Sequence, residues 1–187
     1  MALPALFTRR LALFPWTEQD IDPLHLLWTG AEVRRFLWND QIISREQTEK
    51  TVRACILAAE RRGIGQWTIH EGDSAVLSGF CGFRLSEDTG EAELLYGLTP
   101  ARWRHGFATE AAEEALRYAF DGDLIAYVAA RTNERNTTSE AVMRRLGMAF
   151  DGRIECENGP VVCYSLTRHA FARRRETQCG VRGISCP

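Results

Sequence analysis

The first third of the chain shows a short apolar run followed by two helical patterns. Residues 11–14 are apolar and end at Pro15, which predicts a strand. Residues 17–20 supply an N-cap and acidic first-turn positions ahead of a leucine cluster at 24–27, which predicts a helix. Residues 44–47 form a capping box, and apolar positions then recur every three or four residues up to Gly63. A second helix is therefore expected here.

The middle of the chain is rich in β-branched and aromatic residues. They gather at 66–70, 75–85 and 91–98, and turn signals separate the three runs at 71–73 and 87–90. Short connections of this kind join antiparallel neighbours. A three-stranded meander is the simplest interpretation.

After Pro100 the pattern becomes helical again, from Phe107 to Phe120. Residues 124–130 are continuously apolar, as expected of a strand covered on both faces. Residues 138–146 are helical and stop at Gly147, and 154–156 with 161–166 predict a final hairpin. The order β-α-α-β-β-β-α-β-α-β-β predicts an α+β fold with a mixed, mostly antiparallel twisted sheet flanked by helices.

Composition places the protein among ordinary globular chains. It has 187 residues, 45% of them hydrophobic and 26% charged, which suits one domain over residues 1–172. Residues 173–187 lack periodicity, so a C-terminal tail that is mobile or draped over the surface is expected. A net charge of -2 argues against nucleic-acid or membrane partners. The apolar start is interrupted by Arg9 and Arg10 and resembles neither a signal peptide nor a membrane span, so we expect a cytoplasmic protein.

The six cysteines do not form a recognisable site. None belongs to a C-x-x-C pair, and none lies beside a histidine at zinc-ligand spacing. We therefore expect reduced thiols and no metal.

The most informative stretch is residues 103–111, between the strand ending near Leu98 and the helix that follows. A helix N-terminus presents unpaired N–H groups and a positive dipole end, and small residues at Gly106 and Ala108 let a phosphate approach the backbone. Neither G-x-G-x-x-G nor the P-loop pattern is present. The alternative is a glycine that only eases a loop into a helix.

Three segments, 93–98, 103–111 and 136–148, together resemble the GCN5-related N-acetyltransferases (GNAT). Residues 8–13 and 103–111 are more narrowly similar to the branch that acetylates ribosomal-protein N-termini, and the resemblance spans about residues 8–166. It implies a three-layer, GNAT-like acyl-CoA acyltransferase fold. It also implies an N-acetyltransferase that moves an acetyl group from acetyl-CoA to an amine by direct attack in a ternary complex.

The resemblance also implies which residues bind coenzyme A. The strand around Leu95 and Tyr96 would pair with the pantetheine arm, and Asn136 would bond the pantetheine or serve as a helix N-cap. Arg102 is a candidate for a charge-assisted phosphate bond, as is Arg104. The pyrophosphate would lie against the backbone N–H groups of Arg104, His105, Gly106, Phe107, Ala108 and Thr109.

For catalysis, the resemblance implies a carboxylate base and places Glu93 in that role, with Glu91 as the second candidate. A backbone N–H near Leu95 or Tyr96 would meet the oxyanion.

This chain has Met143 where many members of the family have a tyrosine that protonates the leaving thiolate. The similar ribosomal-protein branch commonly lacks this tyrosine too and has a serine at the place of Ser139, so the resemblance implies Ser139 as the candidate acid or thiolate hydrogen-bond donor. Its alternative role is that of a first-turn helix serine. Tyr164 is a weaker candidate.

The acceptor is left open by the sequence. A protein N-terminus is one candidate and a small metabolite or antibiotic amine is another, since one scaffold serves both. A non-catalytic acetyl-CoA sensor is an alternative of another class. A helix-turn-helix regulator is disfavoured, because residues 138–146 offer only two arginines. The aromatic segment at 28–43 would either line an acceptor pocket or pack in the core, and the chain would act as a monomer or a homodimer.

Overall fold

The computed structural model describes residues 3–86 and 89–181, which contain an eight-stranded sheet in the order β1-β2-β3-β4-β5-β6-β8-β7. Neighbouring strands are antiparallel except β5 and β6, which are parallel. The mixed, mostly antiparallel sheet predicted from the element order is thereby confirmed. The strands are β1 (Leu6–Phe7), β2 (Leu11–Pro15), β3 (Gln66–Glu71), β4 (Leu77–Leu85), β5 (Ala92–Leu98), β6 (Tyr127–Asn133), β7 (Ala149–Ile154) and β8 (Val161–Thr167).

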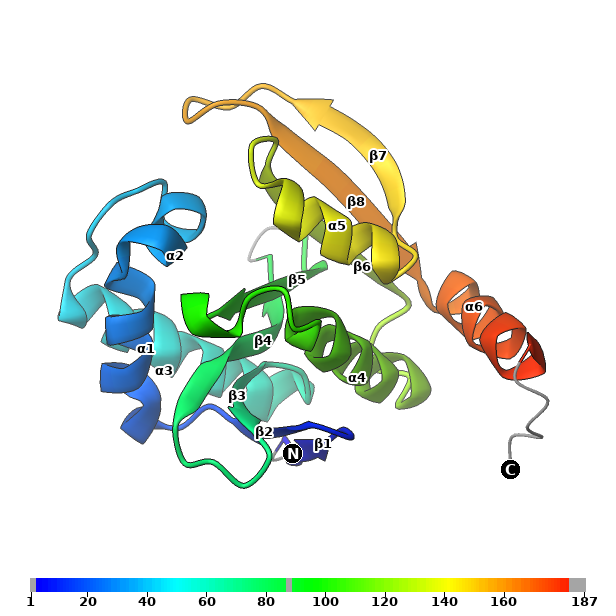
Figure 1. Cartoon of the computed structure of the whole chain (residues 1–187), viewed down its shortest axis with the longest axis horizontal. Helices are drawn as coiled ribbons and strands as arrows, with labels where there is room; N and C mark the ends of the chain where they lie inside the picture. The colour runs from blue at the N-terminus through cyan, green and yellow to red at the C-terminus, as the bar shows by residue number, and fades with distance from the viewer. Residues whose placement is uncertain (1–2, 87–88, 182–187) are drawn as a thin grey trace.

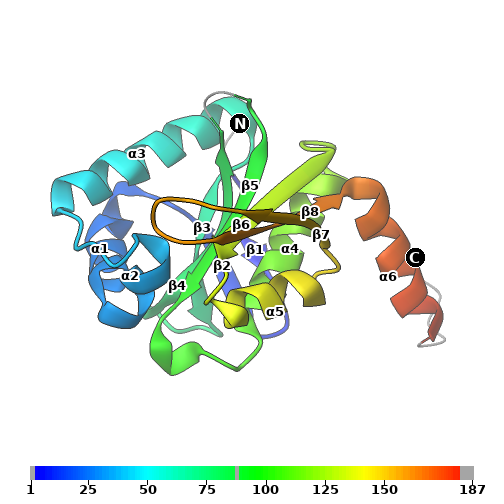
Figure 2. The same ribbon diagram turned by 90° about the horizontal axis from the view of Figure 1, so that it is seen from above.

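Helices cover both faces of the sheet, as Figures 1 and 2 show. On one face α4 (Phe107–Asp121), α5 (Thr137–Arg145) and α6 (Arg168–Val181) pack over a large core, in which four alanines of α4 are fully buried. On the other face a second, aromatic core lies under α1 (Ile21–Thr29), α2 (Ala31–Leu37) and α3 (Arg45–Arg62). The 3-10 turns η1 (Glu18–Asp20) and η2 (Pro100–Arg102) precede α1 and α4.

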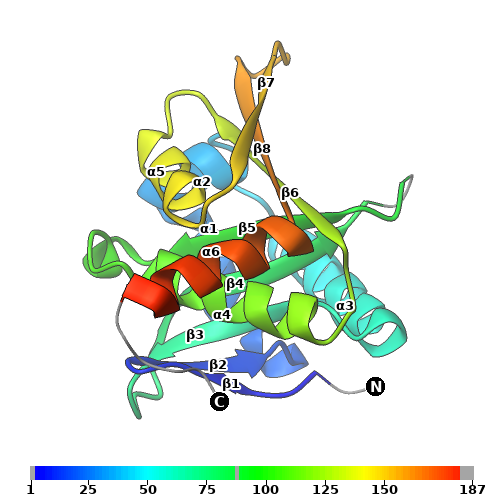
Figure 3. The same cartoon turned by 90° about the vertical axis from the view of Figure 1, so that its right-hand side faces the viewer.

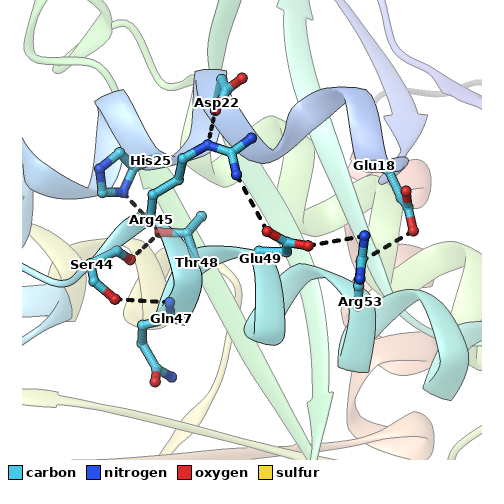
Figure 4. Close-up of polar contacts among 9 residues, drawn as sticks. All are labelled: Glu18, Asp22, His25, Ser44, Arg45, Gln47, Thr48, Glu49 and Arg53. Carbon is cyan, nitrogen blue, oxygen red and sulfur yellow. Dashed lines mark hydrogen bonds and ion pairs between the residues drawn. The ribbon is translucent and has the colours of Figure 1, made fainter.

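Ion pairs fasten η1 and α1 to α3 along their exposed sides (Figure 4). Arg45 Nε lies 2.7 Å from Asp22 Oδ1, and Arg53 Nε lies 3.2 Å from Glu18 Oε1. Arg45 lowers the pKa of Asp22 below its usual value through this hydrogen bond. Such exposed pairs contribute little stability individually. We therefore expect the aromatic core beneath these helices to contribute most of the stability that holds them on the sheet.

The strands β5 and β6 separate after a short pairing. Their register covers only Ala92 with Val128 and Glu93 with Ala129, and β6 continues as a partner of β8 alone. Figure 3 shows β6, β8 and β7 rising away from β1–β5, with α5 beside them. The divergence leaves one side of β5, from Leu94 onward, without a strand partner among the described residues. Two candidate site residues, Glu93 and Tyr96, lie on β5 at and beyond this point.

The C-terminal segment corrects one expectation. The lack of periodicity after residue 172 did not predict a helix, but α6 continues through Val181. Phe171 is buried, with its ring centroid 5.3 Å from that of Phe120, and Arg174 lies 2.9 Å from Glu113. Within the part of α6 whose side chains are described, one buried aromatic residue, Phe171, anchors the helix, which is too few for a helical pattern to appear in the sequence. Residues 182–187 of the expected tail lie outside the described residues, and the division at residue 172 stays a prediction.

Several strand bounds also differ from the sequence pattern. The strand expected at 154–156 is β7, which ends at Ile154 and pairs with β8 from there back to Ala149. None of its residues is buried, so no hydrophobic alternation marks it. The apolar run at 124–130 begins as a core-packing loop, and β6 starts at Tyr127. Within the described residues, no helix combines the length and apolar character needed to cross a membrane.

Candidate active site

The N-terminal turn of α4 presents backbone donors to one side. Arg104 and Gly106 have φ angles of 63° and 81°, which produces a turn whose N–H groups converge. The N-cap is Gly106, which has no side chain, so residues 107–109 keep N–H groups without an intrahelical acceptor. Thr109 Oγ1 is also buried, with no hydrogen-bond partner among the described residues. Together these donors suit an anion.

An open groove of about 740 Å³ lies against this turn, and its free charges are positive. Its lining includes Arg9, Arg104 and Arg145, which have no carboxylate partner within residues 3–86 and 89–181. The lining glutamates are each paired with an arginine beyond the groove: Glu110 with Arg10, Glu113 with Arg174 and Glu114 with Arg117. Unpaired guanidinium groups next to free N–H donors fit the pyrophosphate of the expected coenzyme. Sequence reasoning did not assign Arg9 or Arg145 to this site, although both lie in segments that resemble the family, because local spacing does not show that these segments lie beside the start of α4.

Arg102, by contrast, faces elsewhere. Its Nη2 atom lies 2.9 Å from Glu71 Oε2, and the residue does not line the groove. The phosphate contact that we expected for Arg102 is therefore not supported. His105 does line the groove, and its Nδ1 atom lies 2.8 Å from the carbonyl oxygen of Trp103.

A partly buried hydrogen-bond network connects the turn between β1 and β2 to α4. Glu110 accepts hydrogen bonds from Thr8 Oγ1 at 2.6 Å and from Arg10 Nε at 2.7 Å. The Arg10 guanidinium also stacks over the Phe107 ring, 4.7 Å from its centroid. Burial alone would raise the pKa of Glu110, but the hydrogen bonds from Thr8 and Arg10 lower it below the ordinary value of 4.5. The network holds the first turn of α4 against the sheet edge.

Glu110→Gln is expected to destabilise the protein by about 1 to 2 kcal/mol at pH 7, because an ionised acceptor is lost. The folded pKa lies below the unfolded one, so this contribution is present above pH 4.5 and disappears as pH falls through the folded pKa. Urea unfolding at several pH values measures it. Glu114→Gln is the matched control, since it removes only an i,i+3 pair on the same helix. A constant difference from pH 7 to pH 3 would contradict the assignment.

The register of β4 and β5 shows which backbone groups of β5 point toward β6, the strand that diverges from it. Thr99 N–H donates to Ser78 O, and hydrogen-bonded pairs alternate along an antiparallel ladder. Leu95 is therefore bonded to Gly82, whereas the N–H of Tyr96 points toward diverging β6. Of the two N–H groups expected near the oxyanion, only that of Tyr96 is available.

The side chain of Tyr96 reaches the first turn of α5. Its Oη atom lies 2.9 Å from Ser139 Oγ and 3.0 Å from Ser139 O. Asn136 Oδ1 accepts from Ser139 N–H at 3.2 Å, so Asn136 is the N-cap of α5. Met143, one turn further, is buried. The structure thus brings together three of the expected site residues, and it adds a phenol hydroxyl that the sequence did not point to.

Tyr164, the weaker proton-donor candidate, is already engaged. Its Oη atom donates to Glu140 Oε1 at 2.7 Å and accepts from Arg144 Nε at 3.1 Å. The ring is buried between β8 and α5. A structural role explains these contacts fully.

Glu93 lies where β5 and β6 part, on the opposite face of β5 from Tyr96, because alternate residues face opposite ways. Its carboxylate is 2.5 Å from Arg84 Nη2 and 3.6 Å from Arg131 Nη1, and the side chain is 13% exposed. Glu91 is exposed and precedes the strand. Glu93 therefore lies at the end of the β5–β6 pairing, and Ser139 contacts Tyr96, whose side chain is on the other face of β5.

The aromatic segment expected at 28–43 is mainly core. Trp28 is 2% exposed, and its ring centroid lies 5.7 Å from that of Trp16 and 5.6 Å from that of Trp38. Leu95 packs against the same cluster from the strand that carries Glu93. The cluster therefore packs against β5 on the face that carries Leu95.

Comparison with known proteins agrees with this geometry. Residues 10–149 match the family model described as the acetyltransferase (GNAT) domain. The chain is 30% identical over 151 residues to the uncharacterized N-acetyltransferase YoaA of Bacillus subtilis (strain 168), covering 80% of this chain and 85% of that protein.

Solved structures share the fold. RimL, a ribosomal L7/L12 alpha-N-protein acetyltransferase in complex with coenzyme A, superposes with a TM-score of 0.76 at 19% identity, covering 88% of this chain and 98% of RimL. An acetyl transferase of Salmonella typhimurium that modifies the N-terminal serine of L7/L12 gives 0.74 at 21% identity, covering 88% and 99%. With the match over most of its length, this chain belongs to the GNAT family of acetyl-CoA-dependent N-acetyltransferases.

Proposed function

We propose that the protein transfers an acetyl group from acetyl-CoA to the α-amino group of a protein N-terminus, by direct attack in a ternary complex. The observation that carries the proposal is the electropositive groove at the start of α4. It is joined by the side of β5 that, beyond Glu93, has no strand partner among the described residues. Its free N–H groups and unpaired arginines suit the coenzyme phosphates. The backbone of β5 beyond Leu94 suits the amide-containing pantetheine arm, which adds as an extended segment does to a strand.

Three groups of this chain have assigned roles in the transfer. Glu93 accepts the proton of the attacking amine, directly or through water. The Tyr96 N–H donates to the oxygen on which negative charge develops. Ser139 donates a hydrogen bond to the sulfur that leaves.

The proposed acceptor is supported by two structural neighbours whose names state N-terminal acetylation. An extended N-terminus would enter beside the aromatic cluster and place its amine near Glu93, where β5 and β6 part. A small metabolite or antibiotic amine and a binding-only sensor are the competing functions, and the same assay separates all three.

Acetyl-CoA at a hundred times its Kd is expected to raise Tm by roughly 5 to 10 °C, since binding to the native state alone adds about 2.7 kcal/mol. Adenosine, which lacks the phosphates, is the control and should give no comparable shift. No shift with millimolar acetyl-CoA would contradict the coenzyme site.

The acceptor is tested by coenzyme A release with a peptide that begins with serine. The same peptide with a blocked N-terminus is the control, and spermidine and an aminoglycoside are the small amines. Release with the free peptide alone supports the proposal. Coenzyme A release with small amines alone would mean that the acceptor is a small amine. Acetyl-CoA binding without coenzyme A release in the presence of any amine would identify a sensor.

A further inference from the structure

Two hydroxyl groups from distant segments meet beside the unpaired side of β5. Tyr96 Oη, from β5, lies 2.9 Å from Ser139 Oγ and 3.0 Å from Ser139 O, at the first turn of α5. The two residues are 43 positions apart in the sequence. Ser139 N–H is held by the Asn136 cap, so the serine backbone is fixed on one side and its hydroxyl on the other.

The Tyr96 phenol acts here as a hydrogen-bond donor. Burial raises its pKa well above the ordinary value, and the bond with Ser139 offsets this only in part, so the hydroxyl stays protonated at neutral pH. Its one proton can be donated to Ser139 O, which only accepts, or to Ser139 Oγ, a contact in which either oxygen can be the donor. A hydrogen bond to Oγ leaves the serine proton free to turn toward a third atom.

Met143 explains why such a pair matters in this chain. It occupies the next turn of α5 on the face that Ser139 presents, is 1% exposed, and cannot donate a proton. Among the described residues, the polar side-chain contact of Ser139 on this side comes from Tyr96. A phenol from the sheet therefore reaches the helix that carries no phenol of its own there.

We propose that Tyr96 is a positioning residue for acetyl transfer, whose hydroxyl orients Ser139 so that the serine proton faces the departing sulfur. This inference rests on the proposed function. As the amine nitrogen bonds to the acetyl carbon, its proton passes to Glu93. The C–S bond breaks and the sulfur keeps the electron pair, with the Ser139 hydrogen bond stabilising the thiolate. Tyr96 keeps its proton throughout, and its bond to Oγ strengthens the serine as a donor.

A double-mutant cycle tests the positioning role. Tyr96→Phe and Ser139→Ala are each expected to lower the single-turnover rate by on the order of tenfold, measured with the best amine of the panel above. The double variant should be no slower than the slower single variant, because Tyr96 acts through Ser139. The Kd for acetyl-CoA and the KM for the amine should stay within about twofold.

Tyr118→Phe is the matched control. It removes another phenol hydroxyl, which donates to Gly63 O at 2.9 Å away from the groove, and should leave the rate unchanged. A second readout needs no acceptor: the preference for coenzyme A over desulfo-coenzyme A should shrink in both Tyr96→Phe and Ser139→Ala.

The outcomes separate the two claims. Effects that add in the double variant, or a Tyr96→Phe protein that loses only stability, would overturn the positioning role while the transferase stands. A wild-type protein that binds acetyl-CoA but acetylates none of the amines would overturn the proposed function and the inference with it.

Discussion

Gly106→Val is expected to weaken acetyl-CoA binding by at least about a hundredfold. Gly106 has a φ of 81°, a region that β-branched residues avoid, so valine forces the first turn of α4 to rearrange. The nearest atom to an added Cβ would be Arg10 Nη2 at 3.5 Å, so the loss comes from the backbone rather than from a clash. Losing two charge-assisted bonds to phosphate costs about 3 to 6 kcal/mol, which exceeds a hundredfold in Kd.

Isothermal calorimetry with acetyl-CoA measures this effect, and Gly72→Val supplies the control. Gly72 also has a positive φ, 55°, in the turn after β3, and nothing lies within 4 Å of an added Cβ. The control should lose stability through the same strain and keep its affinity. Equal affinity losses in both variants, or unchanged affinity in a folded Gly106→Val protein, would show that the N-terminal turn of α4 does not bind the coenzyme phosphates.

Glu93→Gln is expected to lower kcat/KM by about a hundredfold or more at neutral pH while the Kd for acetyl-CoA stays the same. Glutamine keeps the size of the side chain and one acceptor for Arg84, but it cannot take a proton from the amine. The loss should shrink as pH rises, because a larger fraction of the acceptor is then already neutral. Steady-state kinetics from pH 6.5 to about 9.5 would show the convergence.

Arg84→Met separates catalysis from ion pairing. It removes the guanidinium 2.5 Å from Glu93 and leaves the carboxylate in place. If Glu93 is the catalytic base, the rate loss should be far smaller in Arg84→Met than in Glu93→Gln. Equal losses in the two variants, together with equal losses of stability, would make Glu93 a structural partner of the arginine.

Local spacing predicted the elements that bury a regular face. α4 shows this most clearly, because its alanines, leucine and phenylalanines recur on one side and fill the larger core. β7 and α6 were misjudged for the opposite reason, since β7 buries none of its side chains and Phe171 is the buried anchor of α6 within its described part. Pattern reading detects burial, and elements that bury little leave no pattern.

The sequence by itself therefore determined the family, the mixed sheet and the position of the turn that we propose to bind phosphate, because the motifs and periodic patterns that mark them can be recognised segment by segment along the chain. Only the tertiary structure decided which side chains meet. Thr8 and Glu110 are 102 residues apart, and Tyr96 and Ser139 are 43 apart. Arg9 and Arg145 share a groove only because the β1–β2 turn and the end of α5 flank the start of α4. Contacts across such separations arise from strand order and helix packing, which no local spacing encodes.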